Sequence, residues 1–295
     1  MPNRRAVLIV NPNARSGATS REEIVAALAA GGVEALPFAG EASEAAVAAA
    51  AAGTDMIILG GGDGTLNHFA ETVVNIGLPV GILPLGTAND LARTLGIPPD
   101  PMAAAAIIGA GATRVIDLGQ VNGKLFFNVA SIGLSVEVTK RLTRQFKRRW
   151  GVFSYPLAAV DAWRAMRSFR ARIEAGDDRQ SFRSLQLAVG NGRYYGGGMS
   201  VSEDAAIDDG VLDLYCMEPR PLARMAALLP AFRAGRHRAN EAMHCVRAPE
   251  IAVETSRPMP VNTDGELTTT TPARFRVVPR ALTVFVPGAP PPAEG

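Results

Sequence analysis

The stretch MIILGGGDGTLNHFAE (residues 56–71) decides how the first half of the chain folds. Its apolar start predicts a buried strand, glycines and Asp63 follow, and helical periodicity resumes at Thr65. A strand that leads through glycines into a helix points backbone N–H groups and the positive helix end outward, which suits phosphate oxygens. A plain strand-to-helix turn would use the same residues, so this stretch alone leaves both interpretations open.

Length and composition favour a two-domain globular protein. A chain of 295 residues is long for one core, and 47% hydrophobic with 20% charged residues is typical of a soluble protein. A net charge of +2 argues against a general nucleic-acid binder. The two cysteines, Cys216 and Cys245, exclude a disulfide framework and a CxxC metal site, which fits a reducing cytosol. The apolar run at residues 6–10 is too short for a signal peptide, so we expect a cytoplasmic protein.

The first ~115 residues alternate short apolar runs with helical patterns, which predicts an α/β fold with a parallel sheet. The expected strands are residues 5–10, 33–38, 55–60 and 79–84, and the expected helices are residues 19–32, 41–53, 65–77 and 87–96. From about residue 113 the pattern is that of antiparallel strands, beginning with a hairpin whose favoured two-residue turn is Asn122-Gly123. Further strands are expected at residues 179–191, 210–218, 250–255, 273–279 and 281–287, with helices at 155–169 and 221–233.

Several common catalytic sites are excluded. The three lysines (Lys124, Lys140 and Lys147) all lie beyond the α/β half, which removes both a P-loop lysine and a protein-kinase lysine from it. There is no GxSxG elbow, and the three histidines have no zinc-ligand spacing. Glycine-rich backbone, carboxylates and arginines remain as the groups available for chemistry.

Three polar, glycine-bearing loops follow strands of the α/β half. NPNARSG (residues 11–17) follows the first expected strand, GGGDGTLN (60–67) the third, and PLGTANDLAR (84–93) the fourth. The carboxyl ends of parallel strands meet at the edge of the sheet where α/β proteins bind ligands. Asp63 could reach a nucleotide-bound Mg²⁺, and Thr65 could cap the following helix. Together the loops predict a nucleotide crevice.

These three motifs, in this order and spacing, resemble the catalytic domain of the diacylglycerol kinase family, most closely its bacterial soluble lipid kinases. YYGGGM, AAIDDGVLDL and PVNTDGELTTTTPARFRVVPRALTVFVP resemble the family's second domain, so the resemblance covers essentially the whole chain. GGDGT alone is shared with NAD kinases and phosphofructokinases, whereas PLGTAND together with a late DGE is specific to the lipid kinases.

The resemblance implies an N-terminal Rossmann-like α/β nucleotide domain (residues 1–118), a C-terminal antiparallel β-sandwich (119–276) and a last strand that returns to the first domain before a proline-rich tail (277–295). It implies an active site in the interdomain cleft and an ATP-dependent, Mg²⁺-requiring lipid kinase. The residues implied to bind ATP are Asn11, Pro12, Asn13, Ser16, Gly17, Gly61, Gly62, Asp63, Gly64, Thr65, Leu66, Asn67, Thr87 and Asn89.

Two acidic turns of the second half are candidates for metal binding and catalysis, although an ordinary turn beside a strand would explain each. The resemblance implies that Asp209 ligates a structural Mg²⁺ with the carbonyls of Ala206 and Val211, an oxygen-only set that suits this ion. It also implies that Glu266 is the base that takes the proton from the lipid hydroxyl, with Asp264 beside it in an orienting role.

The chain departs from the family pattern at three positions. His68 stands where an acidic residue is usual, Leu36 where a threonine is usual, and Glu203 where a proline is common. The first two touch the expected nucleotide side, so they bear on nucleotide affinity or preference. None replaces a residue to which we assign chemistry.

Residues 140–149 hold six basic side chains and no acidic one, and aromatic residues follow them. Such a cluster suits an anionic membrane surface, each charge contributing ~1 kcal/mol near it, although a solvated helix face explains it equally well. The expected partners are therefore a membrane lipid substrate and, transiently, an anionic membrane surface. We expect no nucleic acid, and a homodimer is left open.

Two other functions compete with a lipid kinase. One is an NAD kinase-like small-molecule kinase, against which PLGTANDLAR and the late DGE weigh. The other is a catalytically weak nucleotide- or lipid-binding regulatory protein, which His68 keeps open and which Asp63, Asp209 and Glu266 oppose. The acceptor itself has no readable motif: diacylglycerol, phosphatidylglycerol, a sphingoid base or another lipid alcohol would fit.

Overall fold

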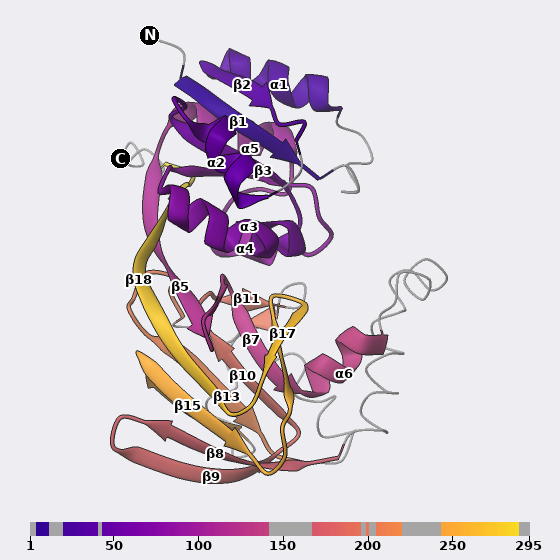
Figure 1. Ribbon diagram of the computed structural model, residues 1–295, viewed down its shortest axis with the longest axis vertical. Helices are drawn as coiled ribbons and strands as arrows, with labels where there is room; N and C mark the ends of the chain where they lie inside the picture. Colours follow the sequence, from indigo (N-terminus) through magenta and orange to yellow (C-terminus); the bar gives the residue numbers. More distant parts are fainter. Residues whose placement is uncertain are drawn as a thin grey trace, which may run out of the picture. The chain divides into compact units, whose positions relative to one another are not determined.

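The computed structural model describes residues 4–11, 20–40, 43–141, 167–195, 199–200, 205–219 and 243–288. The chain divides into two compact units, residues 1–117 with 279–295 and residues 118–278. Two strands, β5 (Thr113–Val121) and β18 (Ala273–Phe285), run from one unit into the other (Figure 1). None of the described helices has the length and apolarity to cross a bilayer.

The first unit is built on a parallel sheet with the strand order β2-β1-β3-β4. Its strands are β1 (Arg4–Val10), β2 (Val33–Pro37), β3 (Met56–Gly61) and β4 (Val80–Pro84). β18 extends the sheet beyond β4 through parallel pairing of Val284 with Val80. Every residue of β3 and β4 is buried, as expected for strands covered on both faces.

Helices cover this sheet, with α1 packed against α5 and α2 against α3 (Figure 1). They are α1 (Arg21–Ala30), α2 (Glu44–Ala51), α3 (Asp63–Ile76), the short α4 (Asp90–Thr94) and α5 (Pro101–Ala110). The connection from β1 to β2 runs along the sheet in the opposite direction to those from β2 to β3 and from β3 to β4. Right-handed crossovers therefore place α1 on one face and α2 and α3 on the other. This reversal makes the carboxyl ends of β1 and β3 a topological switch point, where α/β sheets bind ligands.

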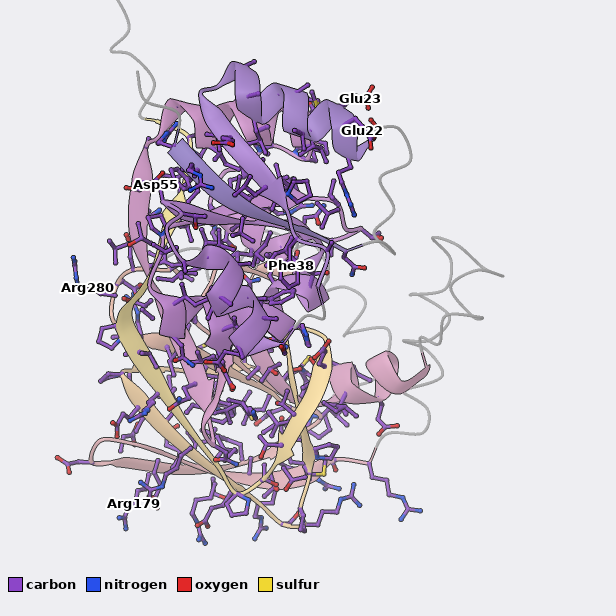
Figure 2. All side chains as sticks on the ribbon, turned by 45° about the horizontal axis from the view of Figure 1, so that its top comes forward. Glu22, Glu23, Phe38, Asp55, Arg179 and Arg280 are labelled. Carbon is purple, nitrogen blue, oxygen red and sulfur yellow. The ribbon has the colours of Figure 1, made fainter. Side chains whose placement is uncertain are left out.

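Local capping explains where the helices begin. At α1, the Ser20 hydroxyl accepts the Glu23 N–H at 3.1 Å and the Glu23 carboxylate accepts the Ser20 N–H at 2.6 Å; Figure 2 labels Glu23 at this end of the helix. The sequence interpretation missed α5. Its signal was the Asp100-Pro101 pair, because Asp100 caps the helix and proline suits the first helical position.

The second unit is an antiparallel β-sandwich. One sheet has the order β14-β13-β10-β7-β16-β17, and the other continues from β18 through β15 and β8 to β9, with β5 and β6 beside it. The strands not yet bounded are β6 (Lys124–Phe126), β7 (Val129–Gly133), β8 (Phe169–Ala175), β9 (Asp178–Ser184), β10 (Gln186–Gly190), β13 (Leu212–Met217), β14 (Met243–Ala248), β15 (Glu250–Thr255), β16 (Pro260–Thr263), β17 (Glu266–Thr270) and the separate pair β11 (Tyr194–Tyr195) and β12 (Met199–Ser200). Between the sheets lies one apolar core to which both contribute, including Ile132 and Leu187 from the first and Val253 and Phe275 from the second.

The Asn122-Gly123 hairpin turn is confirmed: both residues have positive φ, 47° and 89°, and Val121 pairs with Lys124. The rest of that expected hairpin is wrong. The chain leaves β6 after three residues, enters the other sheet as β7, and turns into α6 (Leu134–Arg141) where we expected strand.

Other strand predictions also change. The strand expected at residues 179–191 is two strands, β9 and β10, which belong to opposite sheets and meet at Leu185. The two strands expected after residue 272 form the single strand β18, which continues through Pro279. Just after this proline Arg280 takes a φ of 53° and donates its N–H to Asp117 Oδ1 at 2.7 Å, which holds the chain in the strand. β8 and β14 were not predicted. The expected helix at 221–233, and that at 155–169 up to residue 166, lie outside the described residues.

Candidate active site

In the first unit, the loops after β1 and β3 are tied together at the switch point. The Asn11 N–H donates to the Gly60 carbonyl at 2.9 Å, and Asn11 Nδ2 donates to Thr65 Oγ1 at 2.9 Å. Thr65 lies in the first turn of α3, whose N-cap, Gly62, makes no side-chain capping bond. The N-terminus of α3 can therefore offer its N–H groups and the positive end of its dipole to an anion.

The loop after β4 packs against the same glycines. A Cβ added to Gly62 would lie 3.0 Å from Gly86 Cα, and one added to Gly86 would lie 2.4 Å from Gly62 Cα. Asn89, in the left-handed region with φ 50°, holds this turn: its Oδ1 accepts the Gly86 N–H at 2.9 Å and its Nδ2 donates to the Gly86 carbonyl at 3.0 Å. Packing alone therefore favours glycine at both positions.

Asp63, the first residue of α3, is half-buried and links two helix N-termini. Its Oδ1 accepts the N–H of Leu91, in the first turn of α4, at 3.1 Å. Within the described part of the chain Oδ2 accepts no hydrogen bond. The carboxylate thus caps the N-terminus of α4 with one of its two oxygens.

The remaining predicted nucleotide residues differ in accessibility. Gly64 and Thr87 are exposed, and Asn67 is half-buried. Leu66 is only 3% exposed and belongs to the core, so only its backbone could meet a ligand. His68 is exposed, with its ring edge-on to Phe69 at 4.9 Å. Pro12, Asn13, Ser16 and Gly17 lie outside the described residues, as do the side chains of the basic cluster at residues 140–149.

In the second unit, Glu266 lies at the start of β17, after the two-residue turn that follows β16. Asp264 and Gly265 both have positive φ, 48° and 99°, and Thr263 pairs with Glu266, as in the hairpin turns that favour Asp-Gly. Asn262 Oδ1 accepts the Gly265 N–H at 2.9 Å, and this hydrogen bond stabilises the turn. Glu266 is exposed at the end of this turn.

The Asp264 carboxylate anchors the turn. Its Oδ2 accepts the N–H of Phe127 at 2.7 Å, and its Oδ1 accepts those of Asn128 and Val129 at 3.0 Å each. The Asp264 N–H in turn donates to the Val129 carbonyl at 3.0 Å. Both carboxylate oxygens accept backbone N–H groups, which fixes the turn that Glu266 follows.

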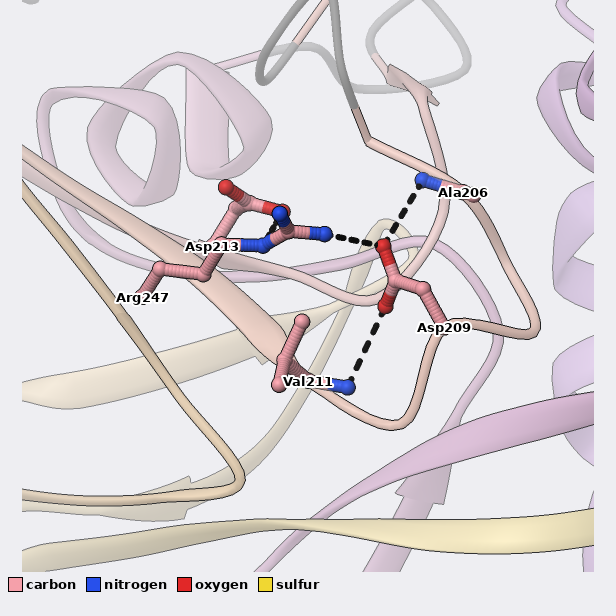
Figure 3. Close-up of polar contacts among 5 residues, drawn as sticks. All are labelled: Ala206, Asp209, Val211, Asp213 and Arg247. Atoms are coloured by element: carbon pink, nitrogen blue, oxygen red, sulfur yellow. Dashed lines mark hydrogen bonds and ion pairs between the residues drawn. The ribbon is translucent and has the colours of Figure 1, made fainter.

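The Asp209 carboxylate also lies among donors (Figure 3). The N–H groups of Ala206 and Val211 donate to it at 3.3 and 3.2 Å, and Arg247 Nη2 pairs with its Oδ2. Mg²⁺ requires oxygen ligands in near-octahedral order, whereas these neighbours are two N–H groups and a cation. The arrangement does not fit the Mg²⁺ expected here, since N–H groups of Ala206 and Val211 face the carboxylate. In the described residues no cluster of three acidic, histidine or cysteine side chains offers an alternative metal site.

A cavity of about 450 Å³ lies beside α6 in the second unit. Its lining comprises Gly133, Val136, Glu137, Arg167, Arg257, Pro258, Met259 and Pro260. The cavity combines an apolar wall with two arginines and one glutamate. β16 begins at Pro260 in this wall and ends at Thr263 beside the Asp264 turn, a span of about 10 Å.

Cys216 is not accessible to a substrate. It is fully buried in the sandwich core, and that burial raises the pKa of its thiol to about 11. The sequence interpretation missed Asn262 and Arg247. An asparagine two residues before Asp-Gly is a local signal for the first, but Arg247 lies 38 residues from Asp209 and has none.

Comparison with known proteins agrees with both halves of this architecture. Residues 5–121 match the diacylglycerol kinase catalytic domain, and residues 128–286 match the YegS C-terminal NAD kinase beta sandwich-like domain. The chain is 37% identical over 254 residues to the "Probable lipid kinase YegS-like" of Pseudomonas aeruginosa, covering 85% of this chain and 83% of the relative. It is 32% identical over 298 residues to the "Diacylglycerol kinase" of Mycobacterium tuberculosis, covering 96% and 95%.

A crystal structure from Bacillus anthracis, described provisionally as a diacylglycerol kinase, superposes with a TM-score of 0.80 at 26% identity, covering 96% of this chain and 95% of that one. A parallel α/β unit followed by an antiparallel β unit, with these relatives, defines an enzyme of the lipid kinase class. The chain belongs to the diacylglycerol kinase catalytic-domain family, as its motifs predict.

Proposed function

We propose that this protein transfers the γ-phosphoryl group of Mg²⁺-bound ATP to the hydroxyl of a membrane lipid such as diacylglycerol or phosphatidylglycerol. The observation that carries the proposal is Glu266, an exposed carboxylate on a turn held by three backbone hydrogen bonds to Asp264. In the reaction the lipid oxygen bonds to the γ-phosphorus and its proton passes to Glu266. The bond from the γ-phosphorus to the β–γ bridging oxygen breaks, and ADP leaves. Phosphoryl transfer needs little more than this positioning and charge neutralisation.

On the nucleotide side, the N–H groups at the start of α3 would bind phosphate oxygens, and Asp63 Oδ2 would reach the nucleotide's Mg²⁺ while Oδ1 keeps its bond to Leu91. Mg²⁺ neutralises charge that develops on the phosphate oxygens. The exposed Thr87 and the loops that Asn11 and Asn89 hold in place complete the proposed site, together with the predicted residues of the loop at 12–17.

On the acceptor side, the cavity beside α6 would take the lipid. Its volume suits a small-molecule site, and its wall of Val136, Met259 and flanking prolines suits the glycerol and proximal acyl carbons. Arg167 and Arg257 would suit an anionic headgroup. The span of β16 leads from this wall toward the turn that carries Glu266. Peripheral docking on an anionic membrane through residues 140–149 belongs to the same proposal.

The direct test is turnover of radiolabelled ATP against lipids in mixed micelles: diacylglycerol, phosphatidylglycerol and a sphingoid base, with NAD assayed separately. We expect a phosphorylated lipid from at least one acceptor and no phosphorylation of NAD. Phosphorylation of NAD without lipid turnover would favour the NAD kinase-like alternative. Tight ATP binding without turnover of any acceptor would favour the regulatory alternative.

The arginines at the cavity predict how acceptors are distinguished. Arg257→Glu should lower kcat/KM for phosphatidylglycerol about 10-fold or more, because a charge-assisted hydrogen bond to the lipid phosphate is lost, and should change that for uncharged diacylglycerol about twofold at most. Both values are measured in neutral detergent micelles. Arg274→Glu, an equal charge change at an exposed residue of β18, is the matched control. Equal losses for both lipids, or the same pattern in the control, would contradict this assignment of the cavity.

A further inference from the structure

The Arg247 guanidinium binds the loop of residues 206–211 through Asp209 (Figure 3). Arg247 projects from β14, where its Cα is paired with that of Asp213 on β13. Its Nη2 pairs with Asp209 Oδ2, and its Nε lies 3.7 Å from Asp213 Oδ2. One side chain therefore spans two carboxylates, one in the loop and one in the sheet.

The burial of Asp213 strengthens this pairing. The Asp213 side chain is 7% exposed, that of Asp209 22%, and that of Arg247 38%. The buried Asp213 carboxylate has lost most of its hydration and repels the partly exposed Asp209 carboxylate, so a cation between the two is favoured. Arginine suits the position because its planar fork can donate to both acceptors and keeps its charge at every physiological pH.

A divalent cation would have to compete for the same carboxylate. It would need to displace Arg247 from Asp209 Oδ2 or remain beside it at the cost of like-charge repulsion. It would also have to give up water for a carboxylate that already accepts the N–H groups of Ala206 and Val211. Because the Arg247 guanidinium is part of the chain, it does not have to lose its water again at each binding event, as a free ion does.

We infer that in this chain Arg247 takes the place of a structural divalent cation at Asp209. The guanidinium fastens the loop of residues 206–211 to β13 and β14, and the second unit holds this conformation without Mg²⁺. The Mg²⁺ that the proposed reaction needs is then the one that accompanies the nucleotide. This inference stands apart from the proposed reaction, since it concerns the folding stability of a unit and not turnover.

Thermal unfolding without nucleotide tests it, in EDTA and in a Mg²⁺ titration to millimolar concentration. The wild-type Tm is expected to be the same in both. Arg247→Met keeps a long side chain but removes the charge, and should lower the Tm by roughly 3–6 °C because the buried Asp213 and the partly exposed Asp209 lose the cation that they share. The matched control is Arg172→Met, which breaks an ion pair with Glu254 of 3.1 Å whose side chains are 63% and 60% exposed. An exposed pair contributes little, so that Tm should change by about 2 °C or less.

Two results would overturn the inference. The first is a saturable rise of the wild-type Tm with Mg²⁺ that Asp209→Asn abolishes, which would restore the metal site. The second is an Arg247→Met Tm equal to that of wild type or of the Arg172→Met control. If Arg247→Met does not fold, the wild-type comparison of EDTA with Mg²⁺ still decides, because it needs no variant with a weakened loop.

Discussion

Glu266→Gln is expected to lower kcat about 100- to 10,000-fold on the preferred lipid, with the affinity for Mg²⁺-bound ATP changed about twofold at most. A lipid hydroxyl holds its proton tightly, so a base must accept that proton as the bond to phosphorus forms. Glutamine preserves the size and hydrogen bonding of Glu266 but removes the basic oxygen. The turn should persist, because Asp264 and Asn262 hold it through contacts that do not involve Glu266.

Steady-state kinetics together with nucleotide-binding measurements check this result. Glu250→Gln, the same change at an exposed residue of β15, is the matched control and should leave kcat unaltered. Asp264→Asn should lose less activity than Glu266→Gln but should also lower the Tm, since an amide group cannot accept the Phe127 N–H with its nitrogen. Near-normal kcat in Glu266→Gln would mean that the proton goes elsewhere, and the proposed mechanism would be wrong.

Asp63→Asn is expected to lower kcat/KM for Mg²⁺-bound ATP about 100-fold or more while the Tm stays close to that of wild type. The loss follows from removing a carboxylate from Mg²⁺, whose charge stabilisation in phosphoryl transfer is worth several kcal/mol. The fold should persist, because asparagine Oδ1 can still accept the Leu91 N–H that links α3 to α4.

The choice of variant decides what this experiment measures. Asp63→Ala would also remove the contact with Leu91, and Gly62→Val would push against Gly86 Cα, so neither separates the chemistry from the packing of the loops. Asp100→Asn, the same change at the cap of α5, controls for the loss of a capping charge. Should Asp63→Asn retain its kcat/KM for Mg²⁺-bound ATP, Asp63 would be a cap for α4 and nothing more.

The sequence by itself predicts the parallel unit well, because its signals are local. Buried strands such as β3 are continuous apolar runs, and the glycines that end β3 mark where the chain must turn. The Asp264-Gly265 and Asn122-Gly123 turns are predicted equally directly, since positive φ at both positions favours those residue types. The candidate nucleotide loops and the candidate base can therefore be located from local sequence signals, and the family resemblance supplies their roles.

Only the tertiary structure decides which distant groups meet. An alternating pattern is the same in either sheet of a sandwich, so residues 179–191 gave no sign that the chain changes sheet at Leu185. Asp264 finds its backbone donors in residues 127–129, more than 130 positions earlier, and the packing of Gly62 on Gly86 follows from neighbouring strands. Nothing local links Arg247 to Asp209. Backbone preference is a property of a few adjacent residues, whereas the partner of a buried charge is set by which strands the core brings side by side.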